Sequence, residues 1–449
     1  MKEVAIVFVL VIVFGASMFL FQQFYYSIIV GCYHTLIKIA SLFNKKASLW
    51  VSGRKNLFEN LKLQFQDNNK KTVWIHCASL GEFEQGRTVM ESLKSKYPDI
   101  KILLTFFSPS GYENQKNYPF ADYVCYLPAD TKANAEKFIS IVKPDIAIFV
   151  KYEFWIHHIN ALHKKQIPLF LISGIFRKNQ LFFKWYAPIF KTALKKYTRI
   201  FVQNENSLTL LQNIKITTAE ICFDTRFDRV KTIAENKKNF PEISTFVKDH
   251  NVIIAGSTWP KDERLLAKAF YKSLVFVNFK IIIVPHNIEK KYMRKTKKIF
   301  AKFSLIYSEL NKATEADLIG KRVLIIDNIG MLSSLYQYSD LNYIGGGFNA
   351  GIHNCLEAAV YGKPVIFGPK FKKFNEAIEL TNRNAAFDVR DYNELLNRIN
   401  LMNQFQFIYE GAASEAEEYV QLHLGGTQQI VTAMEKQLGM EMEEWRMEN

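Results

Sequence analysis

Carboxylates occur just after apolar stretches of this sequence, where a strand would end and a helix would begin. Glu82 ends the run HCASLGE at residues 76–82, and the apolar residues after it have helical spacing. Glu82 should therefore lie in a first helical turn, where the helix dipole favours its negative charge. A carboxylate there can take a proton from an attacking hydroxyl, if its surroundings offset the lowering of its pKa by the dipole. The alternative is a glutamate that only complements the helix dipole.

A second carboxylate occupies a similar position, and a guanidinium lies at the predicted domain junction. Glu153 follows a predicted strand, beside Tyr152 and Trp155, whose rings could form a platform for a sugar or an acyl chain. Arg226 lies in the run CFDTRF, where its charge could neutralise a departing phosphate, although a surface arginine is the more frequent case. Both carboxylates thus fall at the carboxyl end of a predicted strand.

The stretch 344–369, IGGGFNAGIHNCLEAAVYGKPVIFGP, combines a strand end, a glycine cluster, a helix start and a second strand. Glycines 345–347 would let backbone N–H groups approach an anion such as a phosphate. Asn354 is a candidate N-cap, and Glu357, three residues on, suits sugar hydroxyls better than a phosphate. The pattern indicates a sugar-nucleotide site. An ordinary strand-turn-helix with a capping box is the alternative.

Three further predicted strands end in small or hydrogen-bond-donating residues. They close with AGST at 255–258, VPH at 284–286 and DNIGM at 327–331. Loops that contact nucleotides begin in the same way at the carboxyl ends of parallel strands, so we expect nucleotide contacts here.

The composition indicates a folded protein with an anionic partner. The chain has 449 residues, 49% of them hydrophobic, and a formal net charge of +15. The basic residues are spread along the sequence, so an anionic membrane surface, a nucleic acid and a phosphorylated substrate are all candidates. The five cysteines are odd in number and form no CxxC pair, which argues against a disulfide framework and a structural zinc site. They favour a reducing compartment.

The N-terminus predicts a membrane anchor over residues 1–40. No charged residue occurs from Val4 to Ile37, and Val4–Phe21 is a nearly unbroken apolar run of membrane-spanning length. A cleaved signal peptide is the alternative, but the run is too long and no small-residue cleavage site follows it. Basic residues after the run predict, by the positive-inside rule, that the following domains are cytoplasmic. These residues are Lys38, Lys45, Lys46, Arg54 and Lys55, and Tyr25, Tyr26 and Tyr33 would lie near the interface.

Beyond the anchor, short apolar runs alternate with amphipathic segments, the pattern of parallel sheets covered by helices on both faces. A polar stretch at 228–250 interrupts the pattern. We therefore predict an α/β protein with two Rossmann-like domains, 41–228 and 229–449, facing each other across a cleft at the strands' carboxyl ends. The predicted strands are 73–78, 101–106, 122–127, 145–150, 168–173 and 199–203 in the first domain and 252–257, 280–285, 322–327, 341–346 and 364–368 in the second.

The C-terminal segment from about residue 427 is expected to form an acidic surface helix without a chemical role. Its acidic residues are Glu441, Glu443, Glu444 and Glu448.

Six motifs carry a resemblance to a known family. In order they are WIHCASLGE, FVKYEFW, AGSTW, VPHNIE, IIDNIGMLSSLY and GGGFNAGIHNCLEAAVYGKPVIFGP. After an apolar N-terminus, they resemble the 3-deoxy-D-manno-octulosonic acid (Kdo) transferases of lipopolysaccharide synthesis over roughly residues 50 to 425. The resemblance implies a GT-B fold and an inverting glycosyltransferase that moves Kdo from CMP-Kdo to a lipid A precursor, lipid IVA, at the inner membrane. It also implies that no metal or other cofactor is used, and no Asp-x-Asp motif follows a predicted strand.

The resemblance assigns roles to single residues. The family's proton acceptor matches Glu82, and its transition-state stabilisers match Glu153 and Arg226. Its CMP-binding positions match Pro285, His286, Ile329, Gly330, Met331, Asn354, Cys355, Leu356 and Glu357.

The sequence departs from the family pattern at several of these positions. PHN at 285–287 stands where Pro-Arg-His is usual, so a guanidinium clamp on the CMP phosphate is missing or supplied from elsewhere. Arg226 replaces a lysine, which keeps the charge and changes the geometry. Ile352 replaces a glycine and Ala358 a proline. These differences indicate a diverged member.

Two other interpretations remain. A GT-B transferase that uses a UDP-sugar on another membrane lipid would share the glycine loop and the helix after it, but the SLGE motif favours Kdo transfer. A non-catalytic, membrane-tethered protein that binds nucleic acid or phospholipid predicts basic clusters among exposed aromatic residues, which are not evident beyond Lys290–Lys298. We therefore expect CMP-Kdo, a lipid A precursor and inner-membrane lipid as partners, and no nucleic acid.

Overall fold

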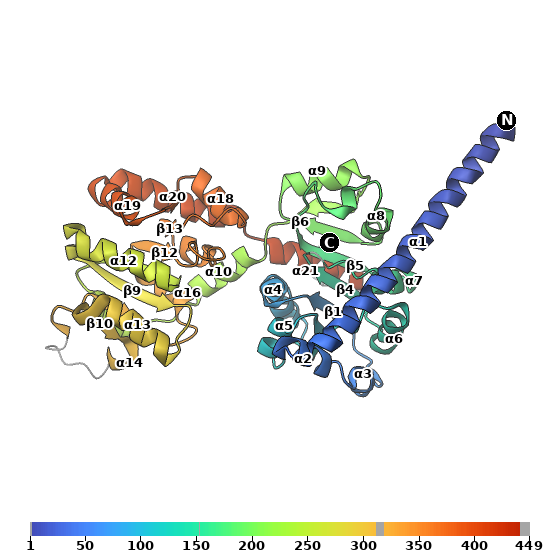
Figure 1. Cartoon of the computed structure of the whole chain (residues 1–449), viewed down its shortest axis with the longest axis horizontal. Helices are drawn as coiled ribbons and strands as arrows, with labels where there is room; N and C mark the ends of the chain where they lie inside the picture. The colour runs from blue at the N-terminus through green and yellow to red at the C-terminus, as the bar shows by residue number, and fades with distance from the viewer. Residues whose placement is uncertain (1, 152, 311–317, 441–449) are drawn as a thin grey trace, which may run out of the picture. The chain divides into compact units, whose positions relative to one another are not determined.

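The structure is a computed structural model that describes residues 2–151, 153–310 and 318–440, with side chains from residue 21 onward. The chain divides into two compact units (Figure 1). Unit 1 comprises Met1–Arg226 and Gly425–Asn449, and unit 2 comprises Phe227–Leu424. Each unit has its own parallel sheet and hydrophobic core, as predicted for two α/β domains. The ligand cleft expected between the two domains stays a prediction.

The strands of unit 1 are β1 (Thr72–Cys77), β2 (Lys101–Phe106), β3 (Tyr123–Tyr126), β4 (Ile146–Val150), β5 (Leu169–Gly174), β6 (Arg199–Val202) and β7 (Ala219–Ile221). Their order in the sheet is β3-β2-β1-β4-β5-β6-β7. The central strands β1 and β4 are buried along their whole length because helices cover both faces of the sheet. The chain winds in opposite directions from these two neighbours, so their carboxyl ends form the crevice where α/β proteins bind ligands.

The described helices of unit 1 connect and cover these strands. They are α1 (Lys2–Ala40), α2 (Lys45–Ser52), α3 (Leu57–Phe65), α4 (Leu80–Lys96), α5 (Pro109–Gln115), α6 (Lys132–Val142), α7 (Ile156–Lys164), η1 (Leu181–Phe183), α8 (Pro188–Leu194), α9 (Glu205–Asn213) and α21 (Gly426–Leu438).

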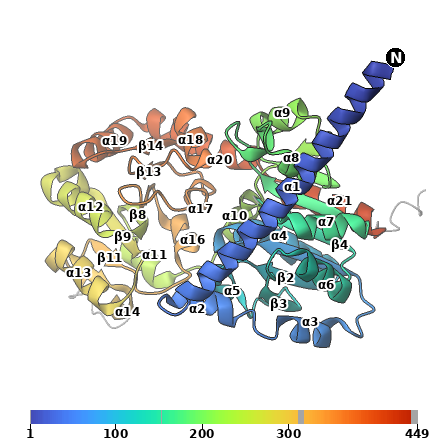
Figure 2. The ribbon, with the colours of Figure 1, turned by 45° about the vertical axis from the view of Figure 1, so that its right-hand side comes forward.

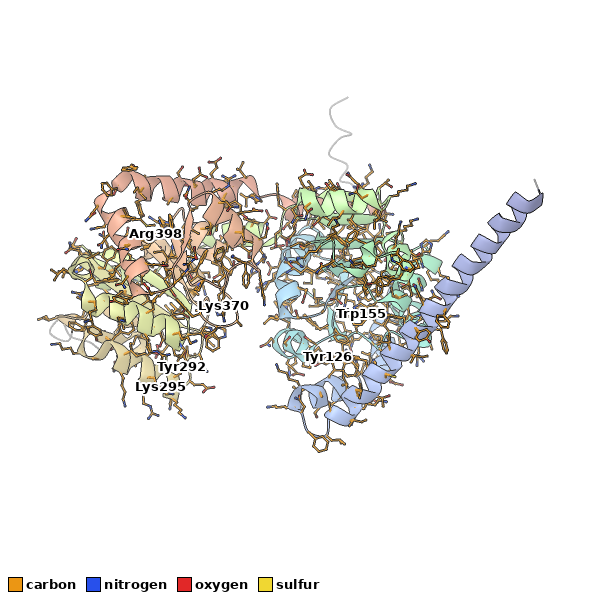
Figure 3. The ribbon with its side chains drawn as sticks, turned by 45° about the horizontal axis from the view of Figure 1, so that its top comes forward. Tyr126, Trp155, Tyr292, Lys295, Lys370 and Arg398 are labelled. Atoms are coloured by element: carbon orange, nitrogen blue, oxygen red, sulfur yellow. The ribbon has the colours of Figure 1, made fainter. Side chains whose placement is uncertain are left out.

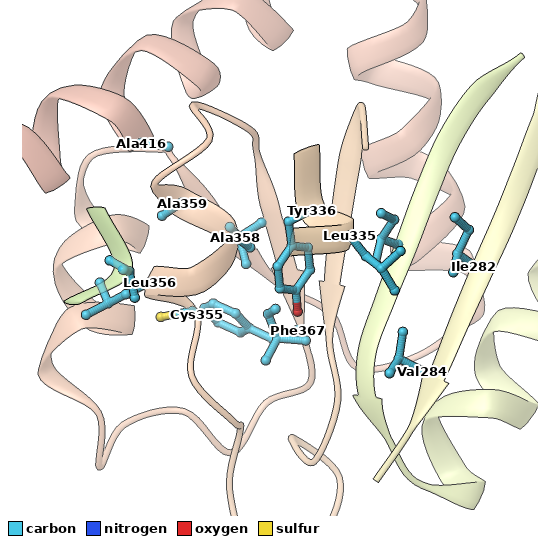
Figure 4. Close-up of a cluster of buried hydrophobic side chains, with 14 of the residues drawn as sticks. Ile282, Val284, Leu335, Tyr336, Cys355, Leu356, Ala358, Ala359, Phe367 and Ala416 are labelled. Atoms are coloured by element: carbon cyan, nitrogen blue, oxygen red, sulfur yellow. The ribbon is translucent and has the colours of Figure 1, made fainter. Parts of the chain in front are cut away.

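The strands of unit 2 are β8 (Asn251–Thr258), β9 (Phe279–Pro285), β10 (Ser304–Ile306), β11 (Val323–Ile325), β12 (Leu341–Ile344), β13 (Val365–Phe367) and β14 (Ala386–Asp388). Their order, β10-β11-β9-β8-β12-β13-β14, has its own reversal between β8 and β12. Part of the core under this sheet is formed by Tyr336, Phe367 and small residues that follow β12 (Figure 4).

The described helices of unit 2 are α10 (Arg226–Glu235), α11 (Pro241–Val247), α12 (Pro260–Lys272), η2 (Leu274–Asn278), α13 (Lys290–Phe300), η3 (Ala301–Phe303), α14 (Tyr307–Leu310), α16 (Leu332–Leu335), η4 (Tyr336–Tyr338), α17 (Leu356–Ala359), α18 (Asn375–Asn382), α19 (Tyr392–Gln404) and α20 (Gln406–Leu422).

All eleven predicted strands are confirmed, with ends that differ by at most two residues. Three further strands, β7, β10 and β14, were not predicted. Each lies at an edge of its sheet and has three residues, which is too short for the continuous apolar run of a central strand.

The second half of α1 packs on unit 1 against α2 and α8 (Figures 1 and 2). The Gln22 amide N–H donates to Tyr186 O at 2.8 Å, and Tyr26 OH donates to the buried carboxylate of Asp130 at 2.5 Å. The part of α1 from Gln22 onward is therefore folded into unit 1, whereas the sequence predicts a separate anchor that extends to residue 40.

Among the residues with described side chains, no single helix is long and apolar enough to cross a membrane. The segments Phe21–Ala40 and Lys45–Ser52 meet the length and composition criteria only as a pair, which is bent by 118°. The predicted spanning run Val4–Phe21 lies almost wholly outside the residues with described side chains, so the anchor stays a prediction.

The C-terminal helix α21 returns the chain to unit 1. Its face with Ile430, Val431 and Met434 is buried against α4 and the sheet. Helix α21 therefore belongs with unit 1, although the sequence predicts a second domain that runs from 229 to 449. The expected acidic surface helix is wrong for α21, because an apolar face is buried there. The acidic residues Glu441, Glu443, Glu444 and Glu448 lie outside the described residues.

Candidate active site

Glu82 lies in the first turn of α4, just after the carboxyl end of β1, as the sequence predicts. Ser79 is the N-cap residue and has an extended backbone, and its hydroxyl donates a hydrogen bond to Glu82 Oε2. The first turn of α4 and the Ser79 hydroxyl therefore hold the Glu82 carboxylate just after the carboxyl end of β1. This is the position that the sequence predicts for a proton acceptor.

Glu153 lies in the loop between β4 and α7, and its side chain is buried. Trp155 Nε1–H donates to Glu153 Oε2 at 2.6 Å, and His76 Nε2 lies 3.1 Å from the same oxygen. Tyr197 OH donates to the Glu153 backbone carbonyl at 2.9 Å. The Trp155 indole (Figure 3) therefore holds the carboxylate. Tyr152, the other ring of the expected platform, lies outside the described residues.

Glu82 and Glu153 lie at the same edge of the sheet, because β1 and β4 are adjacent parallel strands and each residue follows the carboxyl end of one of them. Burial raises the pKa of the thiol of Cys77, the last residue of β1, and the negative charges of Glu82 and Glu153 raise it further. The structure thus brings together two residues that are far apart in the sequence.

Arg226 begins α10, and its guanidinium is held by Asp224. Arg226 Nε–H and Nη2–H donate to Asp224 Oδ2 at 3.0 and 2.8 Å. Burial raises the pKa of Asp224, but the charge and hydrogen bonds of Arg226 outweigh burial and leave this pKa below its usual range. Gln85 Nε2–H, from α4, donates to the same carboxylate at 2.7 Å. This bond ties the Arg226 segment to the helix that carries Glu82.

Sequence reasoning missed three buried polar residues that support this site: His76, Gln85 and Asp224. Each is buried. His76 interrupts an otherwise apolar strand, and Gln85 occupies the buried face of α4, three residues after Glu82. A polar residue at a position where the spacing predicts an apolar one was the available signal, because buried polar groups need hydrogen-bonding partners.

Unit 2 has a stack of three rings after the carboxyl ends of β8, β9 and β12. The Trp259 and His286 ring centroids are 4.7 Å apart, and those of His286 and His353 are 4.6 Å apart. Trp259 Nε1–H donates to His353 Nε2 at 3.1 Å. Burial, and then the charge of His286, lowers the pKa of His353 to about 4. The exposed ring of this stack is His286, which follows the buried Pro285.

The three glycines after β12 serve close packing. Gly345 N–H donates to Gly256 O and Gly346 N–H donates to Asp262 Oδ2, both at 2.9 Å. A Cβ on Gly347 would lie 2.6 Å from Gly368 N. The prediction that these N–H groups face an anion is wrong for Gly345 and Gly346, because a backbone carbonyl and a protein carboxylate already accept their hydrogens.

The side chains of Asn354 and Glu357 are hydrogen-bonded to each other at the start of α17. Asn354 Oδ1 accepts from Leu356 N–H at 3.1 Å, and Asn354 Nδ2–H donates to Glu357 Oε1 at 3.0 Å. The N-cap is Cys355, one residue later than expected, and its side chain makes no capping bond. The side chains of Cys355 and Leu356 are buried in the core (Figure 4). These two residues can therefore offer a nucleotide only backbone atoms.

The remaining predicted nucleotide segment follows β11. Ile329 is 86% exposed, Gly330 has a φ of +85°, and the Met331 side chain is buried at the start of α16. Glycine fits Gly330 because other residues rarely adopt a positive φ. The three predicted segments thus follow the carboxyl ends of β9, β11 and β12 in one sheet.

Comparisons with known proteins support the fold and show similarity to one family. The UDP-GlcNAc 2-epimerase of Neisseria meningitidis, solved with UDP-GlcNAc, superposes with a TM-score of 0.56 at 15% identity over 82% of this chain and 100% of that chain. The family model for 3-deoxy-D-manno-octulosonic-acid transferase (kdotransferase) matches residues 55–229. The 3-deoxy-D-manno-octulosonic acid transferase of Aquifex aeolicus is 29% identical over 351 residues, 76% of this chain and 90% of the relative. The 3-deoxy-D-manno-octulosonic acid transferase of Rickettsia typhi is 26% identical over 368 residues, which is 80% of this chain and 78% of the relative.

The fold is therefore the two-unit α/β fold of GT-B type, which the epimerase shares. Within it, the strand ends of unit 1 carry the carboxylates of the HCASLGE and KYEFW motifs. The chain is similar to the Kdo transferases, through the family model at residues 55–229 and through relatives matched over most of their length.

Proposed function

We propose that this protein is an inverting glycosyltransferase that moves Kdo from CMP-Kdo to a lipid A precursor, lipid IVA. The observation that carries the proposal is the shared position of Glu82 and Glu153 after the ends of the adjacent parallel strands β1 and β4, inside the segment that matches the family model. The relatives' names support the sugar, and the motifs of unit 2 support the nucleotide.

In the proposed reaction, Glu82 accepts the proton of an acceptor hydroxyl. The oxygen of that hydroxyl attacks the anomeric carbon of Kdo, and the bond between this carbon and the phosphate oxygen breaks. CMP leaves with the bonding electron pair, and the configuration at the anomeric carbon inverts. Glu153 stabilises positive charge on the sugar and Arg226 stabilises negative charge on the leaving phosphate. No step requires a metal, and metal independence stays a prediction.

The donor part of the proposal rests on the segments at Pro285–His286, Ile329–Met331 and Asn354–Glu357. The Glu357 carboxylate is oriented by Asn354 and is half-buried, so one of its oxygens can accept from ribose hydroxyls. The exposed His286 can donate to the CMP phosphate where the family has arginine. A transferase that uses a UDP-sugar would share the glycine loop and the helix after it, so the SLGE motif of unit 1 is the feature that favours Kdo transfer.

Calorimetric titration tests the donor part. CMP should bind and UDP should bind more weakly, and Glu357→Ala should weaken CMP binding by about 1.5–3 kcal/mol, the range for hydrogen bonds to a charged group. A thermal melt of the same variant controls for the loss of the Asn354 contact. Lost stability with unchanged CMP affinity would reject the nucleotide role of Glu357, and tighter binding of UDP than of CMP would reject the donor.

The proposal includes attachment of unit 1 to the inner membrane, with the catalytic units in the cytoplasm. No Asp or Glu occurs from residue 4 to 58 or from 154 to 204, and the second range has nine Lys and Arg. Apolar side chains such as Phe24, Ile29 and Leu36 are exposed on α1. Trp185, which precedes the residue that accepts a hydrogen bond from α1, is 87% exposed. Exposed apolar and cationic residues without carboxylates suit an anionic lipid surface.

A further inference from the structure

His76 is a fully buried histidine whose two ring nitrogens both have partners. It lies in β1, the strand that leads to Glu82. Its Nδ1 lies 2.9 Å from Thr105 Oγ1 on the adjacent β2, and its Nε2 lies 3.1 Å from Glu153 Oε2. The ring therefore links the interior of the sheet to a carboxylate of the proposed site.

The neighbours of Thr105 decide which ring nitrogen carries the hydrogen. Trp74 Nε1–H donates to Thr105 Oγ1 at 2.8 Å, so this oxygen already accepts one hydrogen bond. The hydroxyl hydrogen of Thr105 has two acceptors in reach, His76 Nδ1 at 2.9 Å and Ile75 O at 3.5 Å. The shorter contact is the better hydrogen bond. His76 Nδ1 therefore accepts, and the ring hydrogen is on Nε2.

The same conclusion follows from the side of Glu153. Trp155 Nε1 lies 2.6 Å from Glu153 Oε2 and 2.9 Å from His76 Nε2, but it has only one hydrogen to donate. With the ring hydrogen on His76 Nε2, both His76 and Trp155 donate to the carboxylate. In the other tautomer, a nitrogen lone pair would face a carboxylate oxygen 3.1 Å away, which is repulsive.

We propose that His76 is a positioning residue for Glu153, held in one tautomer by a chain of hydrogen bonds from Trp74 through Thr105. The two N–H donors fix Glu153 Oε2. Among the described residues Oε1 accepts no hydrogen bond, so this oxygen is available to the substrate. The role in turnover rests on the function proposed above, whereas the tautomer does not.

A matched pair of variants at Thr105 tests the chain of hydrogen bonds without changing His76 or Glu153. Thr105→Ser keeps the hydroxyl and should retain wild-type turnover. Thr105→Val has the same shape without the hydroxyl, and should lower kcat by tenfold or more with little change in KM for the donor, because small displacements of a reacting group are costly. Equal kcat for the two variants, at equal thermal stability, would show that the Thr105 hydrogen bond does not affect turnover and would overturn the proposal.

A second pair at His76 separates the donor from the packing. Gln can offer an amide N–H near the position of Nε2, whereas Leu fills the site without a donor. His76→Gln should therefore retain more of kcat than His76→Leu, with CMP affinity the same in both. Retention of wild-type kcat by His76→Leu would overturn the proposal.

Nitrogen-15 NMR of histidine-labelled protein tests the tautomer without any substrate. The signal lost in His76→Gln assigns the ring, and its shifts should show hydrogen on Nε2 and a bare Nδ1. Hydrogen on Nδ1, in the neutral or the charged ring, would overturn the proposal. An inactive wild-type enzyme with the expected tautomer would count against Kdo transfer and leave the hydrogen-bond chain supported.

Discussion

At the scale of single residues, the proposed site depends on hydrogen-bond donors that orient two buried carboxylates. Glu153 accepts from Trp155 and Asp224 accepts from Arg226 and Gln85. A buried carboxylate left without such donors would be costly, because it loses its hydration and gains nothing in exchange. Loss of one of these donors should therefore weaken the positioning of the carboxylate that it holds.

Glu82→Gln should abolish transfer and leave CMP binding nearly unchanged. A general base typically contributes about 10²–10⁴-fold to the rate, and glutamine cannot accept the proton. CMP affinity should persist because Glu82 belongs to unit 1 and the predicted CMP segments belong to unit 2. Initial rates measure the loss of transfer, and calorimetric titration measures the CMP affinity. Glu84→Gln, two residues along the same helix, is the matched control, and wild-type turnover by Glu82→Gln would reject the proton-acceptor role.

The protein should lose stability as the pH falls below neutral, because the His353 ring is neutral in the folded state. Its pKa is about 4 in the folded protein and about 6.5 in an unfolded chain. The unfolded chain therefore binds a proton that the folded protein does not bind between these values. The stability that comes from the neutral ring is complete above pH 6.5 and is lost as pH falls toward 4.

The matched variant is His353→Gln, whose amide oxygen can still accept from Trp259 but does not titrate. Its Tm should fall less between pH 7 and pH 5 than that of the wild type. Equal falls in the two proteins would show that His353 is not the titrating group.

Much of the site could be predicted at this scale, because Glu82 and Glu153 follow recognisable apolar runs. The supporting residues could not, since the partners of His76 are on another strand and in a distant loop, and the partner of Gln85 is far along the chain. Spacing reports which residues share a face of one element. It does not report which side chains meet across elements.

At the scale of elements, the long central strands followed from their continuous apolar runs, whereas the three-residue edge strands carry too few residues for a pattern. The glycine cluster after β12 was interpreted as a phosphate loop. The sequence alone could not show that Asp262, from the start of α12, accepts the Gly346 N–H. Glycines that admit a ligand and glycines that admit another backbone look the same in a sequence.

Gly347→Ala should therefore destabilise unit 2. The added Cβ would lie 2.6 Å from Gly368 N, and relief of such an overlap costs typically about 1–3 kcal/mol. Gly411→Ala is the control, because Gly411 lies in α20 with no atom within 4 Å of an added Cβ. That substitution should stabilise the helix by about 0.5–1 kcal/mol. Thermal melts of both variants check the pair, and a Tm for Gly347→Ala at or above the wild-type value would contradict the packing role.

At the scale of the whole molecule, the two α/β units were predictable from the interruption at 228–250. The return of α21 to unit 1 was not, because an amphipathic helix does not specify which sheet it covers. The extent of the anchor was also not predictable, since Gln22 and Tyr26 look like ordinary interface residues until their contacts on unit 1 are known.

Deletion of residues 2–20 should leave a folded protein that still binds vesicles of phosphatidylethanolamine and phosphatidylglycerol, more weakly than the full chain. Adding Trp185→Ser should weaken the remaining binding further, because Trp185 is 87% exposed beside α1. Co-sedimentation measures both steps. Phe407→Ser is the control, since Phe407 is an exposed aromatic residue of unit 2. Equal effects of the two serine substitutions would contradict a lipid-facing surface on unit 1.

The most direct test of Kdo transfer is the mass of a purified lipid A precursor after incubation with the full-length protein and CMP-Kdo. The account predicts that the lipid gains the mass of one or more Kdo residues, without added metal, and that CMP is released in equal amount. The same incubation with UDP-N-acetylglucosamine should leave the lipid unchanged. A lipid that gains mass only from the UDP-sugar, or from neither donor although the protein is folded and binds CMP, would contradict the proposed function.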